Sequence, residues 1–301
     1  MTSSNGRTRT IQGVEVPTFL YGTAWKEEAT AGLVERALAA GFRGIDTANQ
    51  RRHYHEAGVG EALAAALRPD EDGAAPSGAT LSAGAGRLQR GDVFLQSKYT
   101  YVEGQDHRLP YDPAADPPEQ VRQSFSSSLE HLGVERLDSY LIHGPQGRRG
   151  LSEADHRVWR TFEQLHAEGH VRLLGISNVS AEQLAALCAF AEVPPAFVQN
   201  RCFARTGWDR DVRDVCRREG VAYQAFSLLT ANRAELARPE VGEIAAKYGV
   251  TVPQVIFRLA LQLDMIPLTG TTDQDHMRED LEVYGFELAE DEVEVLEGLG
   301  G

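Results

Sequence analysis

The chain has 301 residues, of which 42% are hydrophobic and 25% are charged, a composition typical of a globular protein with a sizeable core. Its formal net charge of -14 argues against nonspecific binding to nucleic acid or to an anionic membrane surface. The three cysteines form no CxxC pair, which argues against a disulfide scaffold and a structural zinc site and favours free thiols in a reducing cytoplasm.

The N-terminal residues MTSSNGRTRT are polar and lack the apolar core of a signal peptide. No apolar run in the sequence approaches the ~18 residues of a membrane helix. We therefore expect a cytoplasmic protein that binds neither membranes nor nucleic acid, and a monomer is the expected oligomeric state.

Short apolar runs alternate with longer helical patterns along the chain. The expected strands span residues 19–22, 44–46, 93–97, 138–142, 172–176, 196–199, 221–225 and 265–267. The expected helices span residues 29–40, 58–67, 119–132, 153–168, 181–190, 209–219, 241–248, 253–263 and 273–283. Repeated strand–helix units predict a parallel sheet with helices outside it, and this number of units favours a (β/α)8 TIM barrel that forms one domain over residues 1–301.

An open doubly wound sheet is the structural alternative. That fold normally has a glycine-rich turn after its first strand. Here the first expected strand continues into Gly22-Thr23-Ala24-Trp25, which is not such a turn. The closed barrel is therefore preferred.

Two segments interrupt the alternation. Residues 69–90 are rich in Gly, Ala and Ser, which predicts an irregular surface loop. Residues 101–118 combine aromatic and hydrogen-bonding side chains, as functional loops do more often than plain linkers. Only one short helix fits into residues 287–301, so we expect the 101–118 loop to be the lid that determines substrate specificity. Its predicted substrate contacts are Tyr101, His107, Arg108 and Tyr111.

Polar or aromatic side chains follow most of the expected strands. They are Asp46, Lys98, His143, Ser177 with Asn178, Gln199 with Asn200, Phe226 with Ser227, and Thr269. Catalytic groups of barrel enzymes lie at the carboxyl ends of the strands, so these side chains should meet at one mouth of the barrel. A lone Asp after a strand is often only a helix cap or a turn former, but that explanation does not cover the whole set.

Several of these strand ends carry short motifs of one family. The sequence GFRGIDTA at residues 41–48 resembles the GxRxIDTA signature of the aldo-keto reductases. Ser97-Lys98, Leu141-Ile142-His143, Gly175-Ile176-Ser177-Asn178 and Val198-Gln199-Asn200 resemble that family's lysine, LxH, GxSN and glutamine motifs, in the same order. The resemblance covers nearly the whole chain. It implies an enzyme that reduces aldehydes or ketones with NADPH, or alternatively with NADH.

Carbonyl reduction needs a hydride donor and a proton donor. No side chain donates hydride, so a nicotinamide cofactor is required. The resemblance implies that a tyrosine is the acid, that Lys98 lowers its pKa from about 10, and that Asp46 holds Lys98. It also implies that a neutral His143 orients the substrate carbonyl.

The position of the acid departs from the family pattern. The family places its tyrosine five positions after the aspartate, where this chain has Arg51, and the first tyrosine after Asp46 is Tyr54. We predict that a loop insertion still delivers Tyr54 to the site. His53 and His55 are rival acids, because histidine titrates near pH 6.5. These two histidines and Glu56 are weak evidence for a metal site, and no metal is predicted.

The resemblance also assigns cofactor contacts. Ser177, Asn178 and Gln199 would hydrogen-bond the nicotinamide carboxamide, and Phe226 would stack on its ring in place of the family's usual tyrosine. The pyrophosphate is expected near residues 227–230 and 269–272. Leu268 stands where many family members have a lysine, so His276 or Arg278 would contact the 2′-phosphate. The remaining predicted cofactor residues are Gly22, Thr23, Ser227, Leu229, Thr269, Gly270 and Thr271.

Three further points stay open at this stage. Trp25, just after the first strand, either lines the substrate pocket or is a buried structural residue. The same barrel could be a regulatory or binding protein that senses the cofactor without turnover. Lys98 at its strand end could also form a Schiff base in a lyase, which would leave the Ser-Asn and Gln motifs unexplained.

Overall fold

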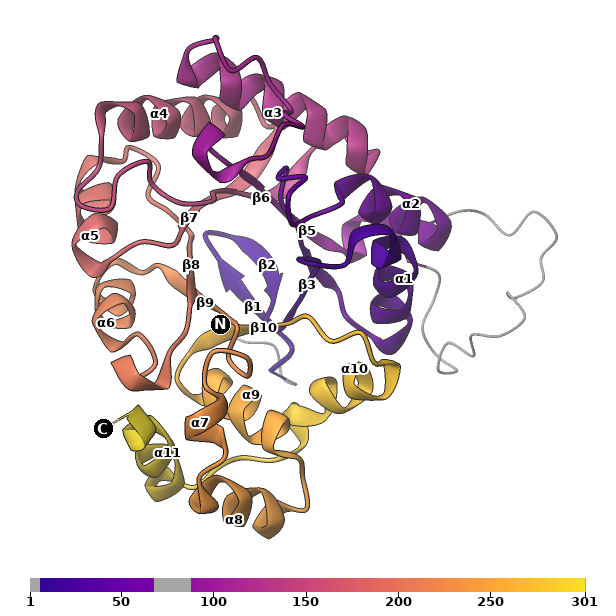
Figure 1. Cartoon of the computed structure of the whole chain (residues 1–301), viewed down its shortest axis with the longest axis vertical. Coiled ribbons are helices and arrows are strands. Elements are labelled where there is room, and N and C mark those ends of the chain that lie inside the picture. The colour runs from indigo at the N-terminus through magenta and orange to yellow at the C-terminus, as the bar shows by residue number, and fades with distance from the viewer. Residues whose placement is uncertain (1–5, 68–87, 301) are drawn as a thin grey trace, which may run out of the picture.

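The computed structural model describes residues 6–67 and 88–300 (Figure 1). Its centre is a closed barrel of parallel strands with the spatial order β10-β3-β4-β5-β6-β7-β8-β9. The strands are β3 (Leu20–Gly22), β4 (Gly44–Asp46), β5 (Phe94–Tyr99), β6 (Leu137–Ile142), β7 (Val171–Ser177), β8 (Phe197–Arg201), β9 (Ala222–Phe226) and β10 (Met265–Thr269). The predicted (β/α)8 barrel is confirmed. Most of the loop predicted over residues 69–90 lies outside the described residues.

Helices form a ring around the strands in Figure 1. They are α1 (Thr30–Ala40), α2 (Glu56–Leu67), α3 (Pro117–Leu132), α4 (Glu153–Ala167), α5 (Ala181–Phe190), α6 (Arg210–Glu219), α7 (Arg233–Leu236), α8 (Pro239–Tyr248), α9 (Val252–Gln262), α10 (Gln274–Leu281) and α11 (Glu290–Glu297). None of the helices in residues 6–67 and 88–300 combines the length and apolar character that a membrane span requires.

Local sequence signals explain where the helices begin. The side chains of Ser152, Ser180 and Thr251 each accept a hydrogen bond from a backbone N–H in the first turn of α4, α5 and α9. Helix α3 begins at Pro117, two residues before the expected start, because Asp116 caps it and proline is well suited to a first turn.

A hairpin of β1 (Thr8–Ile11) and β2 (Val14–Pro17) precedes the barrel and was not predicted. Its turn residues Gln12 and Gly13 both have positive φ, as a tight two-residue hairpin turn requires. The hairpin packs its apolar side chains against Phe94, Phe197 and other residues at the amino ends of the barrel strands. It therefore covers one end of the barrel and leaves the carboxyl ends of the strands for a functional site.

Candidate active site

A cleft of about 850 Å³ opens at the carboxyl ends of the strands. This size suits a cofactor and a small substrate. The cleft brings together most of the predicted site residues, from positions far apart in the sequence. Those that line it are Gly22, Trp25, Asp46, Tyr54, Tyr101, His143, Ser177, Asn178, Gln199, Phe226, Ser227, Leu229, Thr269, Gly270 and Thr271.

Lys98 and Asp46 form a buried ion pair beneath the cleft. The Lys98 side chain is fully buried on β5, and its Nζ donates to Asp46 Oδ1 at 2.6 Å, to Asp46 Oδ2 at 2.7 Å and to the Thr47 carbonyl at 2.9 Å. Burial lowers the pKa of Lys98, and the Asp46 carboxylate opposes that shift. With its amine held by three acceptors, Lys98 is poorly placed to attack a carbonyl as a Schiff-base nucleophile.

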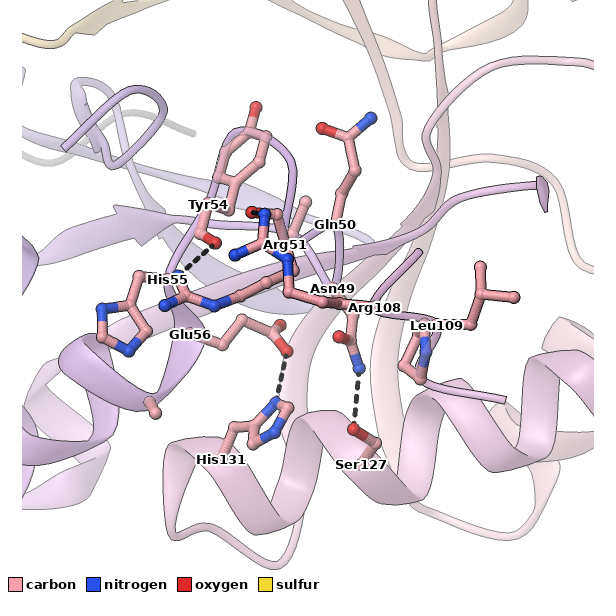
Figure 2. Close-up of a pocket in the computed structure, with 13 residues that line it drawn as sticks. Asn49, Gln50, Arg51, Tyr54, His55, Glu56, Arg108, Leu109, Ser127 and His131 are labelled. Atoms are coloured by element: carbon pink, nitrogen blue, oxygen red, sulfur yellow. Dashed lines mark hydrogen bonds and ion pairs between the residues drawn. The ribbon is translucent and has the colours of Figure 1, made fainter. Parts of the chain in front are cut away.

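Tyr54 reaches this pair through the longer loop. The backbone N–H groups of His53 and Tyr54 both donate to the Gln50 carbonyl, which makes a turn from the additional residues. The Lys98 Nζ lies 5.4 Å from the centre of the Tyr54 ring. The centres of the Tyr54 and His143 rings are 5.7 Å apart. Figure 2 shows the Tyr54 ring pointing away from Glu56 and His131, which lie on the other side of this loop.

The pKa of Tyr54 differs from the expectation. Burial raises this pKa above its ordinary value of about 10, and the Asp46 carboxylate raises it further. Burial and the Asp46 charge thus outweigh the lowering of this pKa that was expected from Lys98. Tyr54 therefore keeps its proton near neutral pH, which is the form that a proton donor needs.

His143 is neutral and fixed in place. Its pKa is lowered to about 3 by burial, with smaller effects from the Lys98 charge and from His53. The Thr100 hydroxyl and His143 Nδ1 share a hydrogen bond of 2.7 Å. The other ring nitrogen is then the one available to a ligand. This agrees with the expected neutral histidine.

The two rival acids lie in different places. His53 lines the cleft, and its ring centre lies 3.9 Å from that of Trp25. Trp25 is 71% exposed, which removes the interpretation as a buried structural residue. The His55 Nδ1 lies 3.2 Å from the Glu27 carbonyl and does not line the cleft. Of the two, only His53 remains a structural rival to Tyr54.

Glu56 serves a structural role beside the loop. It is buried and accepts hydrogen bonds from the hydroxyls of Ser97 and Ser128, and an ion-pair contact from His131 (Figure 2). These contacts tie the start of α2 to β5. In residues 6–67 and 88–300, no cluster of three or more His, Cys, Asp or Glu residues has metal-site geometry.

The predicted nicotinamide contacts surround one end of the cleft. The Asn178 Nδ2 donates to the His143 carbonyl at 2.7 Å and to the Ser177 hydroxyl oxygen at 3.1 Å. The Gln199 Nε2 donates to Asp46 Oδ1 at 3.0 Å, so the Gln199 side chain is tied to the ion pair. Phe226 lines the same region with a half-buried ring. Amide groups next to an aromatic face fit a nicotinamide carboxamide and its ring.

Two cations in the cleft were missed by sequence reasoning. Lys26 is buried, and its Nζ donates to the Gly270 carbonyl on the loop after β10. The Arg201 guanidinium lies over the Phe226 ring, 5.4 Å from its centre. Within the described part of the chain, neither cation has an acidic partner. Two features of the sequence could have indicated these cations. Lys26 directly follows Trp25, and Arg201 lies two positions after Gln199, so both side chains of β8 are on the same face of the strand.

Three predicted cofactor residues do not line the cleft. Thr23 is buried, and its hydroxyl donates to the Asp46 carbonyl at 3.0 Å, so it supports the site from behind. His276 and Arg278 lie on the exposed face of α10, where Arg278 pairs with Asp275 at 2.7 Å. Neither side chain lines the cleft, so their predicted 2′-phosphate contacts stay a prediction.

The segment predicted as a lid is firmly anchored. The Tyr111 hydroxyl donates to the Thr100 carbonyl at 2.7 Å, and the Tyr101 hydroxyl donates to Asp155 at 2.9 Å. Arg108 pairs with Asp106 and faces a smaller neighbouring pocket, and His107 is exposed outside the cleft. Of the four predicted substrate contacts in this loop, only Tyr101 lines the cleft. Glu103 and Gly104, which were not predicted, line it as well.

Comparisons with known proteins place this geometry in a family. Residues 18–300 match the model of the aldo/keto reductase family. An uncharacterised oxidoreductase of Bacillus subtilis, YtbE, is 31% identical over 290 residues, which cover 95% of this chain and 90% of that protein. Glyoxal reductase of the same organism is 29% identical over 301 residues, covering 99% of this chain and 94% of its own length.

Solved structures agree with these matches. An aldo/keto reductase from Brucella melitensis is 26% identical, with a TM-score of 0.76 over 97% of this chain and 98% of that one. A Bombyx mori aldo-keto reductase solved with NADP is 21% identical, with a TM-score of 0.77 over 97% of this chain and 92% of that one, which shows the shared fold. The predicted class, an NAD(P)H-dependent carbonyl reductase, is confirmed by the family match: the chain belongs to the aldo/keto reductase family.

Proposed function

We propose that this chain reduces an aldehyde or ketone to an alcohol with NADPH, and that Tyr54 is the proton donor. The observation that supports this most is the convergence of Tyr54, His143 and the Lys98–Asp46 pair at the inner end of the cleft. These groups provide a protonated acid, a neutral hydrogen-bond donor and a buried cation around one point where a carbonyl oxygen can bind.

The chain's own residues position the substrate and move the proton. The His143 ring nitrogen opposite the Thr100 hydrogen bond donates to the carbonyl oxygen and orients it. When bound, NADPH would supply the hydride that the carbonyl carbon accepts. Tyr54 then gives its hydroxyl proton to the oxygen, which becomes the alcohol hydroxyl. The Lys98 cation next to the ring stabilises the phenolate that remains until solvent returns the proton.

The same proposal places the cofactor along the cleft. Ser177, Asn178 and Gln199 would hold the carboxamide, and Phe226 would stack on the nicotinamide ring. Lys26 and Arg201 line the cleft together with the loops after β9 and β10, and their charges would face the phosphates. They supply the positive charge that Leu268 cannot. The Bombyx mori relative solved with NADP supports the choice of NADPH over NADH.

A deuteride-transfer experiment tests the proposed reaction. The protein is incubated with NADPH carrying deuterium at nicotinamide C4 and a small reactive aldehyde such as methylglyoxal or benzaldehyde. We expect NADPH oxidation at 340 nm together with an alcohol that carries the deuterium at the former carbonyl carbon. Cofactor binding without turnover across a panel of aldehydes and ketones would favour the cofactor-sensing alternative. No feature of the described residues favours that alternative at present.

We further propose that the enzyme works as a single-domain monomer in the cytoplasm. The free thiols support the cytoplasmic part of this proposal, because free cysteines are typical of a reducing compartment. Cys202 and Cys216 are buried and Cys188 is half-buried, and none of the three forms a disulfide. Burial raises the pKa of each thiol, so none is primed as a reactive thiolate. Light scattering coupled to size exclusion tests the monomer: a mass near 33.0 kDa is expected.

A further inference from the structure

Two glutamines below the Lys98–Asp46 pair play no part in the mechanism above. Gln96 on β5 and Gln224 on β9 are both fully buried inside the barrel. The Gln96 Nε2 donates to Gln224 Oε1 at 2.8 Å, and the Gln224 Nε2 donates back to Gln96 Oε1 at 3.0 Å. This reciprocal amide pair spans strands that are not neighbours in the barrel.

The pair is joined to the active site by two further contacts. The Gln96 Nε2 also donates to Asp46 Oδ1 at 2.7 Å. The Gln199 Nε2 donates to the same Asp46 oxygen at 3.0 Å and to Gln224 Oε1 at 2.9 Å. The three glutamines and Asp46 thus form one buried hydrogen-bonded group, which we call the amide layer: Asp46, Gln96, Gln199 and Gln224.

The chemistry of the amide layer fixes which way each amide points. An ionised carboxylate only accepts hydrogen bonds, so both Gln96 and Gln199 must present their NH2 groups to Asp46. Their second N–H bonds then require an acceptor, which is Gln224 Oε1. The Gln199 oxygen accepts no hydrogen bond within the described part of the chain, while Gln199 lines the cleft.

From this geometry we infer that Gln96 and Gln224 are positioning residues that lock the Gln199 amide with its oxygen toward the cofactor. A fixed acceptor at this point recognises the NH2 group of a carboxamide and disfavours a ring substituent that has no N–H. The inference rests on the proposed function, since it assumes that the cleft binds a nicotinamide cofactor. It goes further by assigning a role in cofactor recognition to two residues that do not touch the cofactor.

The locked orientation also has a thermodynamic reason. Rotating the Gln199 amide by half a turn would set its oxygen against Asp46 Oδ1 and Gln224 Oε1, and would break two hydrogen bonds in a buried site. Buried polar groups without partners are costly, so the reversed orientation is strongly disfavoured while Gln224 is present. Without Gln224, the Asp46 contact alone restrains the Gln199 amide.

Binding of three ligands to the full-length protein tests the inference. They are NADP+, its 3-acetylpyridine analogue, in which a methyl group replaces the carboxamide NH2, and 2′-phospho-ADP-ribose, which has no nicotinamide. Calorimetry gives each Kd without any turnover. For the unaltered protein we expect NADP+ to bind about tenfold more tightly than the acetylpyridine analogue, as one good hydrogen bond allows.

Two substitutions at one position separate the role in orientation from simple packing. Gln224→Met keeps the size of the side chain but removes the acceptor, so the preference for NADP+ should fall to about threefold or less. Gln224→Glu keeps the acceptor, and in its protonated form it also donates to Gln96, so it should retain the preference at mildly acidic pH. Binding of 2′-phospho-ADP-ribose should change less than twofold in both variants. Gln254→Met removes a buried glutamine outside the barrel and serves as the matched control.

The outcomes are distinguishable. A Gln224→Met protein that keeps the full preference for NADP+ would overturn the inference, as would equal losses for all three ligands. If Gln224→Met does not fold, Gln96→Met tests the same layer from the other side, with the same expected loss of preference. If the unaltered protein binds 2′-phospho-ADP-ribose but neither dinucleotide, the proposed nicotinamide site fails, and the inference fails with it for a different reason.

Discussion

The Lys98 ammonium lies 5.4 Å from the centre of the Tyr54 ring, although the loop that carries Tyr54 is longer than the family pattern provides. A turn closed on the Gln50 carbonyl accommodates the additional residues, and Glu56 anchors the chain where α2 begins. The insertion therefore changes the path of the backbone but still brings the tyrosine to the lysine.

The buried ion pair gives a prediction for stability. Replacing Lys98 by Met leaves the Asp46 carboxylate buried without its cation, and we expect a loss of about 3–5 kcal/mol in the free energy of unfolding. The double variant Lys98→Met with Asp46→Leu should recover much of this loss, because neither charge of the pair then remains buried without its partner, yet it should be inactive. Urea unfolding with an activity assay checks both points. Equal stabilities of the single and double variants would contradict the ion-pair account.

The cleft cations give a prediction for cofactor binding. Lys26→Ala and Arg201→Ala should each weaken NADPH binding about tenfold at low salt, because each removes a cation that faces a phosphate. The loss should shrink as ionic strength rises, since salt screens these charges. Arg278→Ala is the control, because that side chain is exposed and paired with Asp275. A larger effect of Arg278→Ala than of Arg201→Ala would contradict this account and support the 2′-phosphate contact predicted for Arg278 from the sequence.

The neutral His143 gives a prediction for acid stability. Its pKa of about 3 in the folded protein lies below the ordinary 6.5, so the unfolded chain binds the extra proton more readily. The resulting stability is fully present above pH 6.5 and is lost as the pH falls toward 3, with a slope of at most about 1.4 kcal/mol per pH unit. His143→Gln should flatten this part of the stability profile, as measured by urea unfolding between pH 4 and 7. An unchanged slope would show that His143 is not buried in the neutral form.

The barrel and most of the cleft could be predicted because strand ends carry the relevant residues. Asp46, His143 and Gln199 each follow an apolar run, and parallel strands bring such ends to one mouth. The β1–β2 hairpin was missed because its strands are only four residues each and its turn signal, Gln12-Gly13, is weak. Its position depends on the finished barrel, whose amino end it covers.

Other features depend on contacts that sequence patterns do not report. Gln96 and Gln224 stand inside apolar strands, where their function as a pair becomes visible only when β5 and β9 face each other across the barrel. Lys26 gains a role only because the loop after β10 approaches it. The 101–118 segment shows the converse case, since Tyr111, one of the aromatic residues that suggested a lid, is a buried anchor that donates to the Thr100 carbonyl.

The identity of the proton donor is the central claim, and one kinetic comparison tests it most directly. The kcat for aldehyde reduction is measured under NADPH saturation for Tyr54→Phe and for His53→Ala, with Tyr284→Phe as a tyrosine control at the other end of the barrel. We predict that Tyr54→Phe lowers kcat by roughly 10²–10⁴-fold while the Kd for NADPH stays within about twofold, because only the transferable proton is lost. His53→Ala should retain kcat within a few fold. A Tyr54→Phe enzyme that keeps its kcat, beside a His53→Ala enzyme that loses it, would contradict the assignment.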